Sequence, residues 1–137
     1  MRSINMKKEV AGTVEELIPR LTENLKAEGF GVLTSIDMRA KIKEKLGKDI
    51  APIVILGACN PQLAYEAYSM DPDVASLLPC NAVVRQAAPG RVSVELARPS
   101  ALMQLVGDER LKALAETADD RLARVLDRLE PAIRIEG

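Results

Sequence analysis

One stretch, residues 51–84, constrains the fold of this chain most, because it joins two strand patterns through marked helix starts. Four consecutive aliphatic residues at positions 53–56 are typical of a short strand that is covered on both faces. Asn60-Pro61 then predicts a helix start, since asparagine is a favoured N-cap and proline loses no hydrogen bond at the first helical position. A later Asp-Pro pair repeats this signal ahead of the next strand.

The two cysteines flank the helical part of this stretch. Cys59 ends the first strand, just before the helix start, and Cys80 begins the next strand. If the two strands are antiparallel neighbours, both thiols lie at the same end of the sheet, whereas parallel strands place them at opposite ends. We expect the antiparallel arrangement, and therefore a pair of thiols at a common rim of the sheet.

Composition narrows the class of protein. A chain of 137 residues with 47% apolar and 28% charged residues is typical of one globular domain. Its formal net charge of −1 and its three aromatic residues favour neither a nucleic-acid partner nor a membrane surface. No segment approaches the ~20 apolar residues of a membrane span, and the first ten residues lack a signal-peptide core, so we expect a cytoplasmic protein.

The chain contains no histidine. Histidine is the most common general acid–base in enzymes and a common ligand of transition metals. Its absence excludes Ser-His-Asp and Cys-His catalytic arrangements, and it leaves Asp, Glu, Lys or Tyr as proton shuttles. We therefore rank an enzyme, such as a thiol-dependent hydrolase or transferase, below a binding or interaction role, and the sequence indicates no particular cofactor.

The N-terminal part of the chain predicts a strand, a helix and a second strand. A weak strand over residues 3–10, whose apolar face Lys8 interrupts, leads into a helix that opens with a capping box at Thr13. Pro19 falls inside this helix, and we expect a kink there with the proline on the outer side. The second strand is expected over residues 30–36.

A second helix is expected over residues 38–46, with Asp37 as its N-cap. Met38, Ile42 and Leu46 repeat every four positions, and we expect them to face inward. The remaining surface of this helix is strongly basic. We interpret it as a solvent-exposed face rather than an anion site, because acidic residues lie alongside.

The C-terminal part predicts a hairpin followed by helices. Residues 91–97 alternate apolar and polar side chains behind a Pro-Gly turn, which is typical of a strand in a hairpin. A short helix is expected over residues 99–106, with Leu102 and Leu105 buried. Asp108 is expected to cap a long helix that runs to about Leu129 and ends at Pro131.

This order of elements predicts an α+β fold. It is strand-helix-strand-helix-strand-helix-helix-hairpin-helix, and an evident hairpin after the first strands indicates a mixed or largely antiparallel sheet with helices packed mainly on one face. Strict alternation with parallel crossovers is the alternative. A sheet that is covered on one side leaves its other face in need of protection, so we expect a homodimer.

Three segments carry a resemblance to a known family. They are GFGVLTSID (residues 29–37), ILGACNPQLAYEA (residues 55–67) and LLPCN (residues 77–81). In their order and spacing they resemble the family catalogued as domain of unknown function 302. The resemblance covers roughly residues 1–106 of the single domain expected over 1–137, with residues 107–130 as an additional C-terminal helix. It implies a small prokaryotic α+β domain that tends to form homodimers, has no established activity, and has both cysteines in its pattern.

The cysteine pair is the candidate site, and two interpretations of it stay open. A cysteine ahead of a helix start can have a lowered pKa, which suits Cys59. With Cys80 it could then form a reversible disulfide, carry a sulfane sulfur or bind a soft metal such as Cu(I), with Met38, Met70 or Met103 as a third ligand. Alternatively, both cysteines are small buried packing residues.

The neighbouring polar residues have the same two interpretations. Asn60 and Asn81 each follow a cysteine and could orient a ligand, although helix capping accounts for the first and strand pairing for the second. Tyr65 and Tyr68 could cover a pocket or pack half-buried. The sequence thus predicts a homodimeric binding or carrier module with a two-cysteine site, or else a structural or protein-interaction domain.

Overall fold

The computed structural model describes residues 4–129 of the chain; Ser3, Glu130 and Pro131, which the predicted elements include, lie outside this range. Five strands form one sheet in the order β1-β5-β4-β3-β2, and every neighbouring pair is antiparallel. The antiparallel α+β prediction is therefore confirmed, and the alternative with parallel crossovers is wrong. The strands are β1 (Asn5–Ala11), β2 (Gly31–Asp37), β3 (Ile53–Cys59), β4 (Cys80–Ala88) and β5 (Arg91–Ala97).

The helices follow the predicted order along the chain. Within the described residues, no helix is long and apolar enough to cross a membrane. The helices are α1 (Val14–Ala27), α2 (Met38–Leu46), α3 (Pro61–Met70), α4 (Pro99–Met103) and α5 (Lys112–Asp127), with the 3₁₀ turns η1 (Pro72–Leu77) and η2 (Glu109–Leu111).

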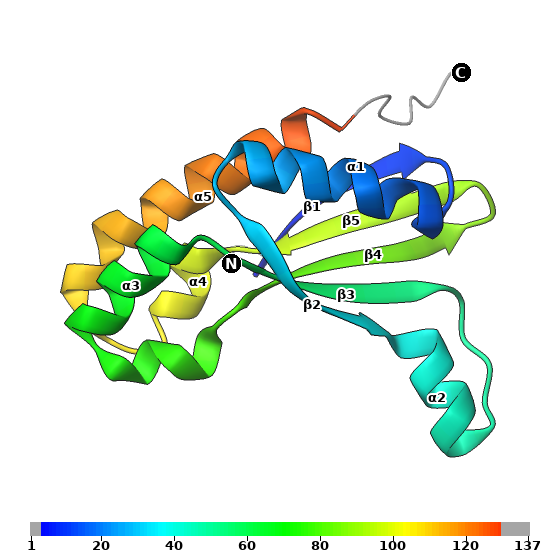
Figure 1. Cartoon of the computed structure of the whole chain (residues 1–137), viewed down its shortest axis with the longest axis horizontal. Coiled ribbons are helices and arrows are strands. Elements are labelled where there is room, and N and C mark those ends of the chain that lie inside the picture. The colour runs from blue at the N-terminus through cyan, green and yellow to red at the C-terminus, as the bar shows by residue number, and fades with distance from the viewer. Residues whose placement is uncertain (1–3, 130–137) are drawn as a thin grey trace.

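The main core lies between one face of the sheet and the helices α1 and α5 (Figure 1). Val92, Val94 and Leu96 of β5 are fully buried in it, as their alternation predicts. The intervening Glu95 is buried as well, on the other face of the sheet, where its carboxylate accepts hydrogen bonds from Arg85 Nε at 2.7 Å and Ser93 Oγ at 2.8 Å.

Local signals set most element boundaries. The Asp37 side chain accepts a hydrogen bond from Ala40 N at 2.9 Å and so caps α2, while Asp108 caps η2 ahead of α5. Pro19 lies on the exposed side of α1, as expected. Lys8 points to the face of the sheet that the helices cover. Its ammonium group has a partner there, because it donates a hydrogen bond to the Leu126 carbonyl at 3.0 Å near the end of α5.

Three expectations about burial are wrong. No residue of α2 is buried, and Leu46, which was expected to face inward, is 66% exposed, because this helix projects away from the sheet (Figure 1). Leu105 is 76% exposed, because α4 ends at Met103 instead of continuing. In β3 only Leu56 of the four aliphatic residues is buried, because the helices cover one face of the sheet.

Gly57 allows two neighbouring elements to approach β3. A Cβ atom placed there would overlap the Thr34 hydroxyl of β2 and come within 2.8 Å of Pro79 Cγ, just before β4. The substitution Gly57→Ala should therefore destabilise the fold by about 1–3 kcal/mol through overpacking, as measured by urea unfolding. Gly31→Ala is the matched control, because no atom lies within 4 Å of a Cβ at Gly31. Equal stability of the two variants would contradict the explanation.

Candidate functional site

The register between β3 and β4 places both cysteines at one end of the sheet. Ala58 pairs with Cys80 across the two antiparallel strands, so Cys59 follows the residue that lies directly opposite Cys80. The expected common rim is thus confirmed for the two positions, although strand alternation directs Cys80 to the face of Ala58 and Cys59 to the other face. Both cysteines are free and partly buried.

Asn60 anchors the helix that begins at this rim. Its side-chain oxygen accepts a hydrogen bond from Leu63 N at 3.1 Å, so it is the N-cap of α3, as predicted. Its amide nitrogen donates to the Glu28 carbonyl at 3.5 Å, and the residue is only 6% exposed. Gly29 adopts a φ of 84° beside this amide, where a Cβ would lie 2.9 Å from the Asn60 nitrogen. Asn60 therefore ties the start of α3 to the end of α1.

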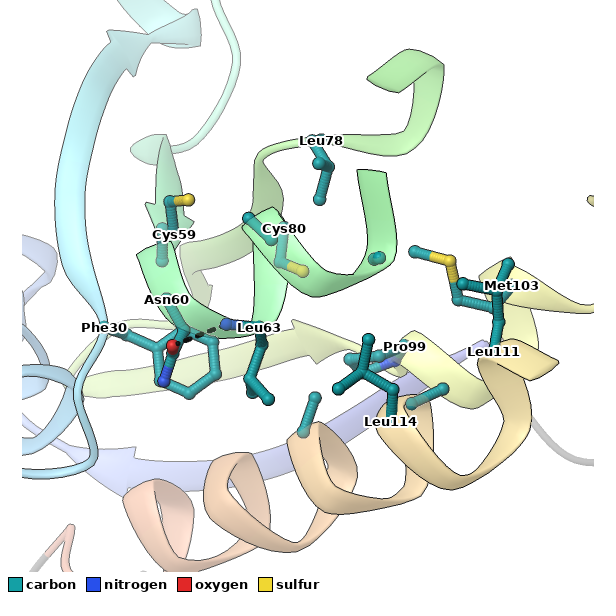
Figure 2. A pocket seen from close by; sticks show the side chains of 15 residues that line it. Phe30, Cys59, Asn60, Leu63, Leu78, Cys80, Pro99, Met103, Leu111 and Leu114 are labelled. Carbon is teal, nitrogen blue, oxygen red and sulfur yellow. Dashed lines mark hydrogen bonds between the residues drawn. The ribbon is translucent and has the colours of Figure 1, made fainter. Parts of the chain in front are cut away.

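An apolar pocket of about 50 Å³ lies beside the two cysteines, bounded by the strand ends, α3, α4 and α5. Figure 2 shows Cys59 and Cys80 on adjacent strand ends at one side of the pocket, with Met103 and Leu111 at the far side. The three sulfur-containing side chains in the wall are therefore Cys59, Cys80 and Met103. Other large side chains in the wall are Phe30, Leu63, Leu78, Pro99 and Leu114.

Small side chains on two helices leave the space for this pocket. Ala64 and Ala67 on α3, and Ala115 and Ala118 on α5, all line it. No motif in the sequence marks these alanines as part of a site. Two alanines spaced three apart on each helix place small side chains on one face, and this repeated spacing is the signal that could have indicated them.

Both thiols are held in the neutral form. Burial raises the pKa of Cys59, so the expectation that the helix start lowers it is wrong. Burial, followed by the charges of Cys59 and Asp119, raises the pKa of Cys80 to about 11. Because Asn60 already accepts from an amide at the start of α3 and the surroundings of the thiols are apolar, loss of hydration outweighs the helix dipole here.

Several other predicted residues lie away from the pocket. Asn81 is exposed and pairs with Gly57, and it points to the opposite face from Cys80 because successive strand residues alternate. Tyr65 is 70% exposed and Tyr68 is 54% exposed, so neither lies in the wall of the pocket, and only Tyr68 is about half-buried.

Of the methionines proposed as a third ligand, only Met103 lines the pocket. Met70 packs against the small core of Ala67, Val74 and Leu111 next to the pocket without lining it, and Met38 belongs to the projecting helix α2. Among residues 4–129, no three or more His, Cys, Asp or Glu side chains gather in a metal-binding arrangement. Any metal would therefore have to rely on the two thiols and on Met103.

A second, polar cavity of about 400 Å³ adjoins the apolar pocket between α4 and α5. Met103, Leu111 and Ala115 belong to the walls of both. Asp119 in its wall accepts a hydrogen bond from Ser100 N at 3.0 Å. The apolar pocket is thus separated from a polar cavity by only a few side chains.

Comparison with known proteins gives a family and a solved relative. The family model described as domain of unknown function DUF302 matches residues 6–129, a range that includes α5. The crystal structure of an uncharacterized conserved DUF302 protein from Bacillus stearothermophilus is 38% identical in sequence. The match covers 93% of this chain and 98% of the Bacillus chain, with a TM-score of 0.86. No curated protein matches the chain.

The raised pKa values predict slow thiol chemistry in the folded protein. At pH 8 a thiol with a pKa of about 11 holds about a hundredfold less thiolate than one with the ordinary value of 9.0. At pH 8, Cys80 of the wild-type chain, followed on its own peptide, should therefore react with iodoacetamide about a hundredfold more slowly in the folded chain than in urea. The rate should rise about tenfold per pH unit up to about pH 11, because the thiolate is the reactive form.

Mass spectrometry of quenched time points measures these rates. The Cys80→Ser variant serves as the comparison, and its remaining thiol, Cys59, should react faster in the folded chain than Cys80 does. Equal reaction rates of Cys80 in the folded and unfolded chains at pH 8 would contradict the assigned environment.

Proposed function

The chain belongs to the DUF302 family, and we propose that it is a homodimeric binding module that holds a small, uncharged, apolar ligand in the pocket beside Cys59 and Cys80. The observation that carries this proposal is the apolar cavity itself, which adjoins both thiols. A reducing, cytoplasmic setting is part of the proposal, because it keeps the two thiols free.

The alternative that the cysteines are only packing residues explains their burial but not the cavity. Larger side chains at Ala64, Ala67, Ala115 or Ala118 would fill this space of about 50 Å³, yet each of these positions carries alanine. Four small residues that together keep the space open support a role for it in binding.

The chemistry of the walls supports an uncharged ligand. Almost all side chains around the cavity are apolar, and the two thiols stay protonated at neutral pH because burial raises the pKa of each. The Asn60 side chain is the polar exception, and both its oxygen and its nitrogen already have hydrogen-bond partners. A charged group placed here would lose its hydration without compensation.

The homodimer is supported by the one-sided cover of the sheet. The helices α1 and α5 pack on one face only, and Leu33 and Ile36 of β2 are exposed. Exposed apolar side chains grouped on one element are typical of an interaction surface. A binding role is favoured over catalysis because the sequence has no histidine and the pKa of both thiols is raised.

A second candidate ligand is a soft metal ion such as Cu(I). Cys59, Cys80 and Met103 line the same pocket, and thiolate and thioether ligands together suit Cu(I). Binding would displace the protons of both thiols, so the affinity should rise steeply with pH.

Xenon, a small apolar probe, tests the cavity directly. Under xenon pressure, the amide resonances of pocket residues should shift in the wild-type chain and in Ala113→Val, whose altered side chain is exposed on α5. They should not shift in Ala115→Val, because valine fills the cavity from the same helix. The helix-propensity cost of Ala→Val, about 0.5 kcal/mol, is the same in both variants. The two variants therefore differ only in whether the valine lies in the pocket.

The natural ligand is sought in the same three proteins. Organic extracts of the purified proteins, analysed by mass spectrometry, should contain a common small apolar compound from the wild-type chain and Ala113→Val but not from Ala115→Val. A xenon response that persists in Ala115→Val, or that is missing from the wild type, contradicts a binding cavity.

The metal alternative has its own measurement. Competition with a chromophoric Cu(I) chelator should show binding by the wild-type chain that weakens about 100-fold for each pH unit lowered, if two protons leave. Met103→Leu preserves the packing and should weaken Cu(I) binding, whereas Met70→Leu, outside the pocket, should not. Equal affinities of the two variants would exclude the three-sulfur site.

A further inference from the structure

We propose that β2 pairs edge to edge with β2 of a second copy of this chain, and that the partner's α2 thereby lies against α3 beside the cysteine pocket. This inference rests on the homodimer of the proposed function and adds its interface and its connection to the site. Five features of the described residues lead to it.

The two edges of the sheet differ in how they are protected. The edge strand β1 carries three consecutive charged residues, Lys7, Lys8 and Glu9, which is a common device against pairing with another chain. The opposite edge, β2, has no charged residue before its last position and no proline. Its Leu33 is 66% exposed and its Ile36 is 44% exposed. The β2 edge is therefore the one suited to an additional strand.

An edge strand selects its partner by backbone hydrogen bonds. Within residues 4–129, β2 has a neighbour, β3, on one side only, so alternate backbone groups of Gly31–Asp37 face outward. A second copy of β2 in antiparallel orientation presents the same set of groups, because a two-fold axis makes the interface self-complementary. The bulge at Leu33 leaves Thr34–Asp37 as the regular part of the edge, which places the axis near Ser35.

The helix that follows β2 leaves part of its apolar stripe exposed. Met38, Ile42 and Leu46 recur every four positions on α2, yet none of them is buried and Leu46 is 66% exposed. Two antiparallel copies of β2 would carry both α2 helices toward the other subunit. The exposed part of the stripe would then gain an apolar neighbour.

The register shows which surface the partner's α2 would reach. Gly31, at the start of β2, pairs with Cys59 at the end of β3, where α3 begins. In an antiparallel pair, the end of the partner's β2 lies next to the start of this β2. The partner's α2 would therefore lie at the α3 end of this subunit, although α2 and α3 of one subunit lie at opposite ends of the sheet (Figure 1).

Helix α2 and the α3–η1 segment are complementary in charge and in the kinds of side chain that they expose. Helix α2 contains four basic residues and one acidic residue, whereas the segment from α3 through η1 contains three acidic residues and no basic residue. Tyr65 and Tyr68 lie exposed on α3, and aromatic rings are favourable neighbours for both aliphatic and cationic side chains. The exposure of these tyrosines is explained if a second copy covers them.

Sedimentation of a charged edge variant tests the strand pairing. The wild-type chain should have twice the mass of one chain, and Leu33→Lys should have the mass of one chain with unchanged circular dichroism. Leu105→Lys is the matched control, because it places the same charge at another exposed leucine, outside the proposed interface, and it should remain dimeric.

Zero-length carbodiimide cross-linking tests the position of the partner's α2. In a dimer mixed from ¹⁵N-labelled and unlabelled chains, Glu66 should cross-link to a lysine of α2 in peptides that carry one labelled and one unlabelled half. Leu33→Lys should lose this cross-link.

The possible failures are distinguishable. A wild-type chain that sediments as a monomer overturns the homodimer of the proposed function together with this interface. A wild-type dimer that Leu33→Lys leaves intact, or a dimer that lacks the mixed Glu66 cross-link, overturns the interface alone. The xenon response of the pocket is unaffected by either result, because it reports on one subunit.

Discussion

The antiparallel pairing of β3 with β4 is the interaction on which the rest of the structure depends. Its register sets Ala58 opposite Cys80, and so it brings the end of one strand and the start of the next to a common rim. The α3–η1 segment must then leave and return at that rim, which positions α3 over the pocket. A shift of one residue would turn the apolar face of β4 away from the core, because side chains alternate along a strand.

Burial, not the helix start, decides the chemistry of the two thiols. A helix N-terminus favours a thiolate by at most about 1–2 kcal/mol, and its effect falls off within one turn. Burial removes water from Cys80 much more than from Cys59, and it raises the pKa of both thiols. Neutral thiols are weak nucleophiles, so this environment disfavours attack by either sulfur at neutral pH.

Much of the fold could be predicted because its signals are local. Asn60 and Asp37 cap helices within three residues of themselves, and a Pro-Gly turn sets the β4–β5 hairpin. The predictions that failed concern contacts between distant segments. Leu46 has a helical apolar pattern but no core to enter, and Tyr65 and Asn81 have suitable side chains but lie on outer surfaces. Periodicity indicates that a residue could be buried, but only a partner element buries it.

The sequence alone determined the order of the elements, favoured an α+β fold with a mixed or largely antiparallel sheet, and marked the cysteine pair as the place to look for a site, because caps, turns and alternation depend on neighbours in the chain. Only the tertiary structure decided that four alanines leave a cavity beside the thiols, that Met103 joins its wall, and that α2 stands apart from the core. These outcomes depend on which surfaces of α3, α4 and α5 meet. Such contacts join residues far apart in sequence, and no local pattern encodes them.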